Sequence, residues 1–207
     1  NLRFHPGEKK GDSQFAKELG TLADAYVNDA FGTCHRTDAS MMAVSEQFPI
    51  ELRAVGLLVE KELRVLDELL GSPKRPLVAV MGGAKVSDKI GFIQALLKRV
   101  DQLLIGGAMT YTFRKARGES VGTSLVEADK LDLAQSLLDH AGDRIVLTCD
   151  HVIAERPEET AAHQIATSDI PDDWCGVDIG PETIAKYSEA ISNAGCVVWN
   201  GPMGKFE

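Results

Sequence analysis

The sequence predicts an α/β protein in which helices cover both faces of parallel sheets. Beyond residue 76, short apolar runs alternate with amphipathic stretches, and this alternation is typical of strand–helix–strand units. The runs lack the polar alternation of a half-exposed strand, so their strands are expected to be buried on both faces. The chain has 207 residues, 44% of them hydrophobic and 26% charged, which suits one or two globular domains.

The first third of the chain contains fewer regular elements. A helix is expected over 12–24, because Asp12 and Ser13 are good capping residues and apolar side chains follow at helical spacing. Residues 25–32 are expected to form a short strand that runs into a glycine turn. Residues 33–56 are expected to be mainly loops.

A second helix is expected over 57–70. Apolar residues step by four, three and four positions from Val59 to Leu70, so they share one face. The sequence at 71–73, Gly-Ser-Pro, ends the helix. This helix and the proline-containing stretch after it are the best place in the chain for a connection between two domains.

The rest of the chain predicts a Rossmann-like sheet. Strands are expected over 76–81, 102–106, 144–149 and 196–199, and helices over 88–99, 128–141 and 182–193. Pro181 stands at the first position of the last helix, where proline is favoured. Residues 154–175 are acidic and interrupt the alternation of strands and helices, so they are expected to form a surface excursion such as a hairpin.

Glycine-rich turns follow three of the four predicted strands of this sheet. They read MGGAKVSDK (81–89), IGGAM (105–109) and WNGPMGKFE (199–207). The carboxyl ends of parallel strands lie at one edge of a sheet, where α/β proteins bind their ligands. Glycine lets the backbone approach a bulky ligand and present N–H groups to it. The three turns therefore predict a nucleotide or phosphate site.

Two lysines in the first of these turns support an anion site. Lys85 and Lys89 lie near the expected start of the 88–99 helix, where the helix dipole and unpaired N–H groups attract anions. Cations at this end weaken a helix unless an anion neutralises them. The alternative is a pair of solvated lysines with Asp88 as a local counter-charge.

Several classes of protein are excluded or disfavoured. The motifs GxxxxGK[ST] and GxGxxG are absent, so the chain is not a P-loop NTPase and lacks the fingerprint of a dinucleotide site. A net charge of −9 argues against nucleic-acid or membrane-surface binding, and no apolar run reaches the ~18–20 residues of a membrane span. The histidines show no metal-binding spacing. Buried reduced thiols are expected, with zinc binding or a disulfide as alternatives, at Cys34, Cys149, Cys175 and Cys196.

Polar residues near the 25–32 strand suggest a polar pocket in the first third of the chain. Five polar or small residues fall within nine positions: Asn28, Asp29, Gly32, His35 and Arg36. Arg3 lies near the beginning of the chain. Arginine binds carboxylates and phosphates through its forked guanidinium. The spacing leaves open whether these residues form a pocket or lie singly on the surface.

Taken together, these segments resemble the phosphoglycerate kinase family. The matching stretches are NLRF (1–4), YVNDAFGTCHR (26–36), VEKEL (59–63), PLVAVMGGAKVSDKI (76–90), LLIGGAMTYTF (103–113), SLVEADKLDLA (124–134), IPDDWCGVDIGPETI (170–184) and VVWNGPMGKFE (197–207). They follow the order of the family and span the whole chain. Because the chain lacks an initiator Met and ends within a Gly-Pro loop, we expect it to be an internal piece of a longer protein.

The resemblance implies parts of two α/β domains joined by a hinge. Residues 1–57 would be the later part of the amino domain, which binds phosphoglycerate, and 58–72 the connecting helix. Residues 73–207 would be most of the carboxyl domain, which binds ADP or ATP with Mg²⁺. The implied enzyme is a glycolytic phosphotransferase, a cytoplasmic monomer with no nucleic-acid or membrane partner. On domain closure it transfers phosphoryl directly and reversibly between 1,3-bisphosphoglycerate and ADP, giving 3-phosphoglycerate and ATP.

The resemblance also implies roles for individual residues. Arg3, Arg36 and Gly32 would bind the phosphoglycerate. Lys85 and Lys89 would contact the nucleotide phosphates and, with Arg36, take part in the transfer. Further nucleotide contacts would come from Gly83, Gly106, Gly107, Gly176, Val177, Asn200 and Glu207. No metal ligand is implied within the chain, because the Asp that serves magnesium in the family belongs to a later glycine-rich segment.

Four positions depart from the family pattern: Asp38, Ala108, Cys175 and Lys205. Segments of both family domains also have no counterpart among the 207 residues, so the chain alone is expected to be inactive or nearly so. One alternative is a truncated protein that binds nucleotide without catalysis. Another is a different kinase built on a similar sheet.

Overall fold

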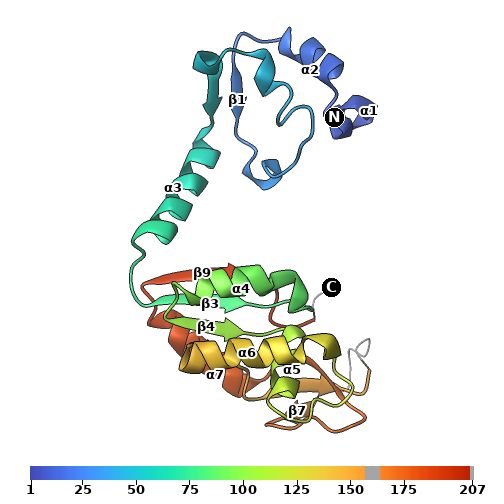
Figure 1. Ribbon diagram of the computed structural model, residues 1–207, viewed down its shortest axis with the longest axis vertical. Coiled ribbons are helices and arrows are strands. Elements are labelled where there is room, and N and C mark those ends of the chain that lie inside the picture. The colour runs from blue at the N-terminus through green and yellow to red at the C-terminus, as the bar shows by residue number, and fades with distance from the viewer. Residues whose placement is uncertain (157–163, 206–207) are drawn as a thin grey trace. The chain divides into compact units, whose positions relative to one another are not determined.

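The computed structural model describes residues 1–156 and 164–205, and Figure 1 follows the chain through them. The chain divides into two compact units, Asn1–Ser72 and Pro73–Glu207. The helices are α1 (Pro6–Lys10), α2 (Ser13–Gly20), α3 (Leu57–Gly71), α4 (Ile90–Leu97), α5 (Met109–Ala116), α6 (Leu131–Ala141) and α7 (Pro181–Ser192). The strands are β1 (Tyr26–Asn28), β2 (Arg53–Val55), β3 (Leu77–Met81), β4 (Gln102–Ile105), β5 (Ile145–Val146), β6 (His151–Ala154), β7 (Gln164–Ala166), β8 (Cys175–Ile179) and β9 (Cys196–Asn200). The predicted α/β class is confirmed.

The first unit contains a two-stranded parallel sheet of β1 and β2. β2 lies in the region expected to be loops. It is three residues long and exposed throughout, so it leaves no hydrophobic pattern in the sequence. The Asp12 carboxylate caps α2 as expected, accepting a hydrogen bond from the Phe15 N–H at 2.8 Å. α2 ends at Gly20, earlier than predicted.

α3 confirms the helix expected over 57–70. The N–H groups of Leu58 and Val59 at its start donate to the Asp29 carboxylate at 2.7 and 3.1 Å. Asp29 therefore caps a helix about 30 residues further along the chain. Val59 is buried as expected, whereas Leu63 and Leu70 of the same apolar face are 45% and 55% exposed.

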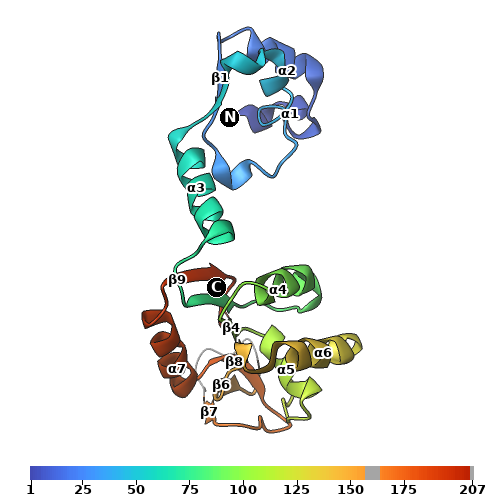
Figure 2. The same cartoon turned by 60° about the vertical axis from the view of Figure 1, so that its left-hand side comes forward.

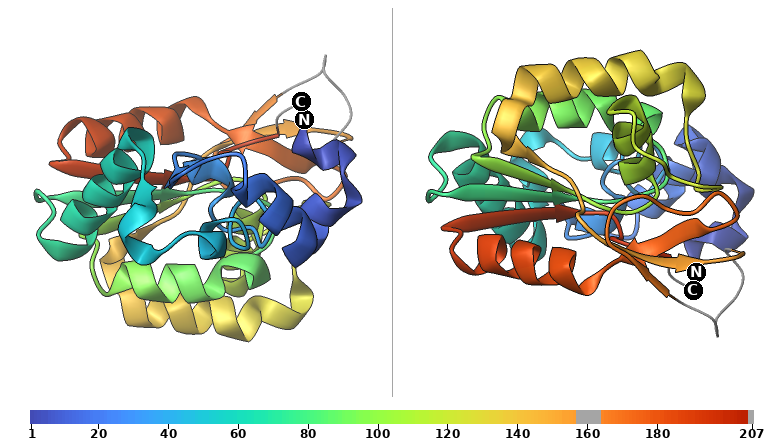
Figure 3. Two further views of the ribbon diagram at one scale, coloured as in Figure 1. Left: turned by 90° about the horizontal axis from the view of Figure 1, so that it is seen from above. Right: turned by 90° about the horizontal axis from the view of Figure 1, so that it is seen from below.

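The main sheet of the second unit is parallel, with the strand order β5-β4-β3-β9. α4 and α6 cover one face and α7 covers the other (Figures 2 and 3). On the α7 side, Val78, Val80 and Leu104 of the sheet pack against Tyr187 of the helix. All five residues of β3 are buried, as expected for a strand covered on both faces.

A second sheet, antiparallel and ordered β7-β6-β8, was not predicted as such. The expected strand over 144–149 shortens to the two residues of β5, and the chain then enters β6. The expected surface excursion over 154–175 therefore includes β7 and leads into β8. β6 and β7 pair as in the suggested hairpin, and residues 157–163 between them lie outside the described part of the chain. Ile153 and Ala166 of this sheet belong to a buried cluster with Tyr111, Val121 and Ile170.

α5 was also not predicted. It follows the second glycine turn directly, and all six residues from Met109 to Arg114 are buried, the polar Thr110, Thr112 and Arg114 included. None of the four cysteines forms a disulfide; Cys175 is buried, but Cys34 is exposed, contrary to the expectation of buried thiols. Among the described helices, none is both long and apolar enough to cross a membrane.

Candidate nucleotide and phosphoglycerate sites

The carboxyl ends of β3, β4 and β9 meet at one edge of the parallel sheet, and backbone hydrogen bonds join the turns that follow them. The Gly82 N–H donates to the Asn200 carbonyl at 2.9 Å. The Gly107 N–H donates to the Met203 carbonyl at 2.6 Å. The three glycine-rich turns therefore form one connected structure.

A cavity of about 600 Å³ opens beside these turns. It is lined by Gly83, Ala84, Gly107, Ala108, Tyr111, Thr123, Leu125 and residues 175–178 and 202–205. Four of the residues expected to bind nucleotide are among them: Gly83, Gly107, Gly176 and Val177. The cavity wall does not include Lys85, Lys89, Gly106 or Asn200. Glu207 lies outside the described residues. The volume is in the range of small-molecule sites.

Glycine is required at two of these positions by close approaches within the protein. Gly107 has a φ of +67°, and a Cβ atom on it would lie 2.6 Å from the Gly83 nitrogen. A Cβ atom on Gly176 would lie 1.9 Å from the Tyr111 hydroxyl. Ala108 begins α5 with a φ of −64°, a right-handed conformation that tolerates a methyl group, so this departure from the family pattern causes no backbone strain.

Lys89 is brought together with Asn200, which lies 111 positions away in the sequence. The Lys89 ammonium donates to the Gly82 carbonyl and to Asn200 Oδ1, both at 2.6 Å. Burial lowers the pKa of Lys89, and the nearby Asp88 carboxylate partly opposes this shift. The structure therefore places a half-buried cation at the turns that border the cavity, with its direction fixed by two oxygen acceptors.

The N–H groups expected to attract an anion near Lys85 are already bonded within the chain. The Val86 and Ser87 N–H groups donate to the Glu127 carboxylate at 2.5 and 3.1 Å. The expectation that these groups await a ligand is therefore wrong. No sequence pattern links Glu127 to this turn, because it is 40 positions from Ser87 and meets it only through the folded chain. Lys85 itself is exposed.

In the first unit, Arg3 forms an ion pair with Asp38, with Arg3 Nη2 and Asp38 Oδ2 3.0 Å apart. Asp38 is one of the departures from the family pattern, so this departure neutralises a predicted substrate-binding arginine. Arg36 is half-buried, and Gly32 is exposed with open space where a Cβ atom would lie. Asp29, expected to lie with these residues, caps α3.

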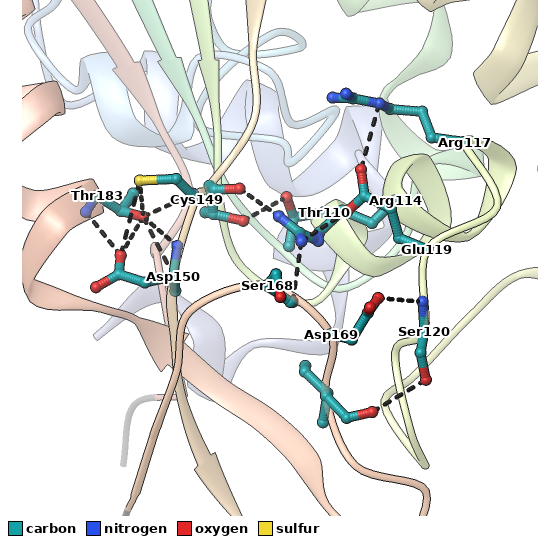
Figure 4. Close-up of polar contacts among 12 residues, drawn as sticks. Thr110, Arg114, Arg117, Glu119, Ser120, Cys149, Asp150, Ser168, Asp169 and Thr183 are labelled. Atoms are coloured by element: carbon teal, nitrogen blue, oxygen red, sulfur yellow. Dashed lines mark hydrogen bonds and ion pairs between the residues drawn. The ribbon is translucent and has the colours of Figure 1, made fainter.

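A buried polar cluster lies where the second sheet meets α5 and α7 (Figure 4). Arg114 is 6% exposed; its guanidinium donates to the carbonyls of Thr148 and Ser168 and pairs with Glu119 at 2.6 Å. Asp150, fully buried, accepts hydrogen bonds from the start of α7. These contacts join segments far apart in the sequence, and we assign them to stability. Sequence reasoning missed them because Arg114 lies among other charged residues and Asp150 beside an apolar run, and their partners come largely from other segments.

The stability of the second unit is expected to fall between pH 6.5 and pH 4 because of His151. Burial, helped by the Arg114 charge, lowers the pKa of this fully buried histidine from 6.5 to about 4, although Asp150 opposes the shift. Below pH 6.5 the unfolded chain therefore binds a proton that the folded chain does not. At pH 5 the free energy of unfolding should be about 2 kcal/mol lower from this group than at pH 7.5.

Urea unfolding followed by tryptophan fluorescence checks this, because both tryptophans, Trp174 and Trp199, belong to the second unit. From pH 7.5 to pH 5, the free energy of unfolding of His151→Phe should fall by about 2 kcal/mol less than that of the unchanged chain. Equal losses in the two proteins would show that His151 is not the responsible group.

Comparison with known proteins agrees with this architecture over the whole chain. The sequence profile of the phosphoglycerate kinase family matches residues 1–207. The chain is 54% identical over 210 residues to a phosphoglycerate kinase of Rhodopirellula baltica and 52% identical over 208 residues to one of Rubrobacter xylanophilus. It is fully covered in both alignments but spans only 53% and 52% of those relatives, about half their length.

Solved structures give the same result. The structure of phosphoglycerate kinase from Coxiella burnetii superposes with a TM-score of 0.83 at 38% identity, covering 100% of this chain and 54% of the other. The crystal structure of phosphoglycerate kinase from Pyrococcus horikoshii OT3 superposes with a TM-score of 0.80 at 29% identity, covering 99% of this chain and 54% of the other. The resemblance seen in the sequence is thus confirmed along the full chain, and the chain belongs to the phosphoglycerate kinase family.

Proposed function

We propose that the chain carries much of the machinery of a phosphoglycerate kinase, which transfers a phosphoryl group reversibly between 1,3-bisphosphoglycerate and ADP and yields 3-phosphoglycerate and ATP in glycolysis. The observation that supports this most is the meeting of three glycine-rich turns at one cavity, with Lys89 and Asn200 hydrogen-bonded beside it. Apolar walls suit a nucleobase, and a cation at the border suits its phosphates.

In this proposal residues 73–207 bind ADP or ATP. The base lies against Gly176 and Val177 in the cavity, and the phosphates point toward Lys85, Lys89 and Asn200. Gly83, Gly106 and Gly107 shape the turns along which the nucleotide lies. Glu207 contacts the ribose hydroxyls.

Residues 1–57 bind the phosphoglycerate through Arg3, Arg36 and Gly32, and residues 58–72 act as the hinge. The domains close for direct transfer, which keeps water away from the acyl phosphate. Phosphoryl transfer needs accurate placement of the reactants and neutralisation of charge that is spread over several oxygens. Lys89 and Arg36 supply such charge, and no covalent intermediate on the protein is required. We expect a cytoplasmic monomer, as the resemblance implies.

Mg²⁺ accompanies ADP and ATP in this proposal. Within residues 1–156 and 164–205, no group of three or more His, Cys, Asp or Glu side chains is arranged to hold a metal ion. The ion is expected to arrive bound to the nucleotide phosphates.

Calorimetric titration of the 207-residue chain with ADP tests the nucleotide site. Leu125 lines the cavity and is 53% exposed, so Leu125→Trp should obstruct the cavity without forcing a large side chain into the core. We expect this variant to bind ADP at least about tenfold more weakly. Leu22→Trp, at a leucine of the first unit that is 78% exposed, is the matched control and should leave binding unchanged. Absence of ADP binding, or equal binding by Leu125→Trp, would contradict the assignment.

The phosphoglycerate site gives a further prediction, because Asp38 competes with an anionic substrate for Arg3. Asp38→Asn removes the ion-pair partner of Arg3 and should strengthen the binding of 3-phosphoglycerate about two- to fivefold, the modest gain expected of a partly exposed pair. Titration of a full-length kinase carrying these residues measures the affinity. Asp24→Asn, at an exposed aspartate of the first unit, is the control. Unchanged or weaker binding in Asp38→Asn would argue against Arg3 as a substrate ligand.

The alternative is a nucleotide-binding protein without catalysis, in which the same cavity and lysines would serve binding alone. Both functions predict ADP binding, and formation of ATP from 1,3-bisphosphoglycerate and ADP distinguishes them. We expect no clear turnover from the 207 residues alone and full turnover when they form part of a full-length kinase. ADP binding without turnover in the full-length protein would favour the alternative.

A further inference from the structure

The Glu127 carboxylate is built into the turn that carries Lys85 and Lys89. Oε2 accepts hydrogen bonds from the Val86 N–H at 2.5 Å and the Ser87 N–H at 3.1 Å. Oε1 accepts a third from the Ser87 hydroxyl at 2.5 Å. These N–H groups begin the helical segment that continues into α4, and the start of a helix leaves its first N–H groups without partners in the helix itself.

Glu127 is itself held in place from α5. Its N–H donates to the hydroxyl of Thr112 at 3.1 Å, and Thr112 is fully buried. A path of hydrogen bonds therefore leads from the interior of α5 through Glu127 to Val86 and Ser87. Burial would raise the pKa of Glu127, but the hydrogen bonds from Ser87 and Val86 outweigh it and lower the pKa, so the side chain is a carboxylate at neutral pH.

The turn between Gly82 and Lys89 is thus anchored at both of its ends. At the first end, the Gly82 N–H bonds to Asn200, and the Gly83 carbonyl accepts from the Met109 N–H at 2.9 Å. At the other end, Glu127 holds Val86 and Ser87. Lys85 lies between the two anchors and is exposed, so the position of its backbone depends on both.

We propose that Glu127 is a positioning residue for the phosphate-binding lysines. It does not touch the nucleotide. It fixes the backbone from which Lys85 and Lys89 reach the phosphates, and it occupies the helix start that a phosphate would otherwise take. This inference rests on the proposed nucleotide site and names the group that orders it.

Three variants of the 207-residue chain, titrated with ADP and with adenosine, test the inference. Glu127→Ala removes the anchor and should weaken ADP binding about tenfold. Its affinity for adenosine, which has no phosphate, should stay within about twofold of that of the unchanged chain. Glu127→Gln loses the charge but keeps an oxygen for the two N–H groups, so it should bind ADP within about threefold of the unchanged chain. Asp129→Ala is the matched control, because it removes an exposed negative charge two residues away without touching the turn.

Hydrogen exchange provides a measurement that needs no ligand. The Val86 and Ser87 amides should exchange faster in Glu127→Ala and stay protected in Glu127→Gln and Asp129→Ala. Three results would overturn the inference. They are equal or tighter ADP binding by Glu127→Ala, an equal loss of ADP and adenosine affinity, and unchanged exchange at the two amides. If the unchanged chain binds neither ligand, the proposed nucleotide site fails together with this inference, a result distinct from all three.

Discussion

Replacement of Lys89 by alanine is expected to lower the kcat of a full-length kinase carrying these residues by about 10³-fold. The transferred phosphoryl group spreads negative charge over its oxygens, and a cation aimed at it stabilises the transition state more than the ground state. The proposed role suits Lys89, because Gly82 and Asn200 fix the direction of its ammonium and burial keeps water partly away from it. A flexible surface lysine would have neither property.

The effect should fall on kcat more than on the KM for ADP, because the base and the other phosphate contacts remain. Lys98→Ala, at an exposed lysine just after the other end of α4, is the matched control and should change kcat less than twofold. Urea unfolding of both variants shows whether Lys89→Ala has also lost stability. A decrease in kcat of less than tenfold, in a folded variant, would remove Lys89 from the transfer step.

Replacement of Asp150 by alanine is expected to lower the free energy of unfolding of the second unit by about 3–5 kcal/mol. Asp150 is fully buried and accepts hydrogen bonds from the Glu182 N–H at 2.8 Å, the Thr183 N–H at 2.7 Å and the Thr183 hydroxyl at 2.6 Å. Alanine would leave the start of α7 with buried donors that have no acceptor. The variant would also remove a carboxylate from the positive end of the helix dipole.

Burial would raise the pKa of Asp150, but the hydrogen bonds from Thr183 and Glu182 outweigh it, so the pKa is lowered. This stabilisation is therefore complete at neutral pH and is lost only as the pH falls through the folded-state pKa. Urea unfolding at pH 7, followed by tryptophan fluorescence, measures the effect. Asp169 is an exposed aspartate that accepts a hydrogen bond from the Ser120 N–H. Asp169→Ala should lower the free energy of unfolding by less than about 1 kcal/mol. Equal losses in the two variants would contradict the special role of Asp150.

The sequence predicted the parts of the fold that depend on local patterns. β3, β4 and β9 are runs of apolar residues, and α3, α4, α6 and α7 show helical periodicity, so their positions could be predicted to within a few residues. α5 could not, because Met109, Tyr111 and Phe113 alternate with Thr110 and Thr112, and a period of two does not indicate a helix. β7 is too short to stand out from loops, and β8 mixes polar and apolar residues.

The features of the candidate site also fall into those that the sequence predicted and those that only the folded structure shows. The glycine turns follow directly from strand ends in a parallel sheet, so the sequence alone determined that they meet at one edge and which family the chain resembles. Only the tertiary structure decided that Glu127 fills the helix start near Lys85, that Asp38 neutralises Arg3, and that Asp150 caps α7. The reason is physical. A hydrophobic pattern repeats along the chain and can be recognised locally, whereas a polar group finds its partner only after folding brings together residues 30 to 40 positions apart.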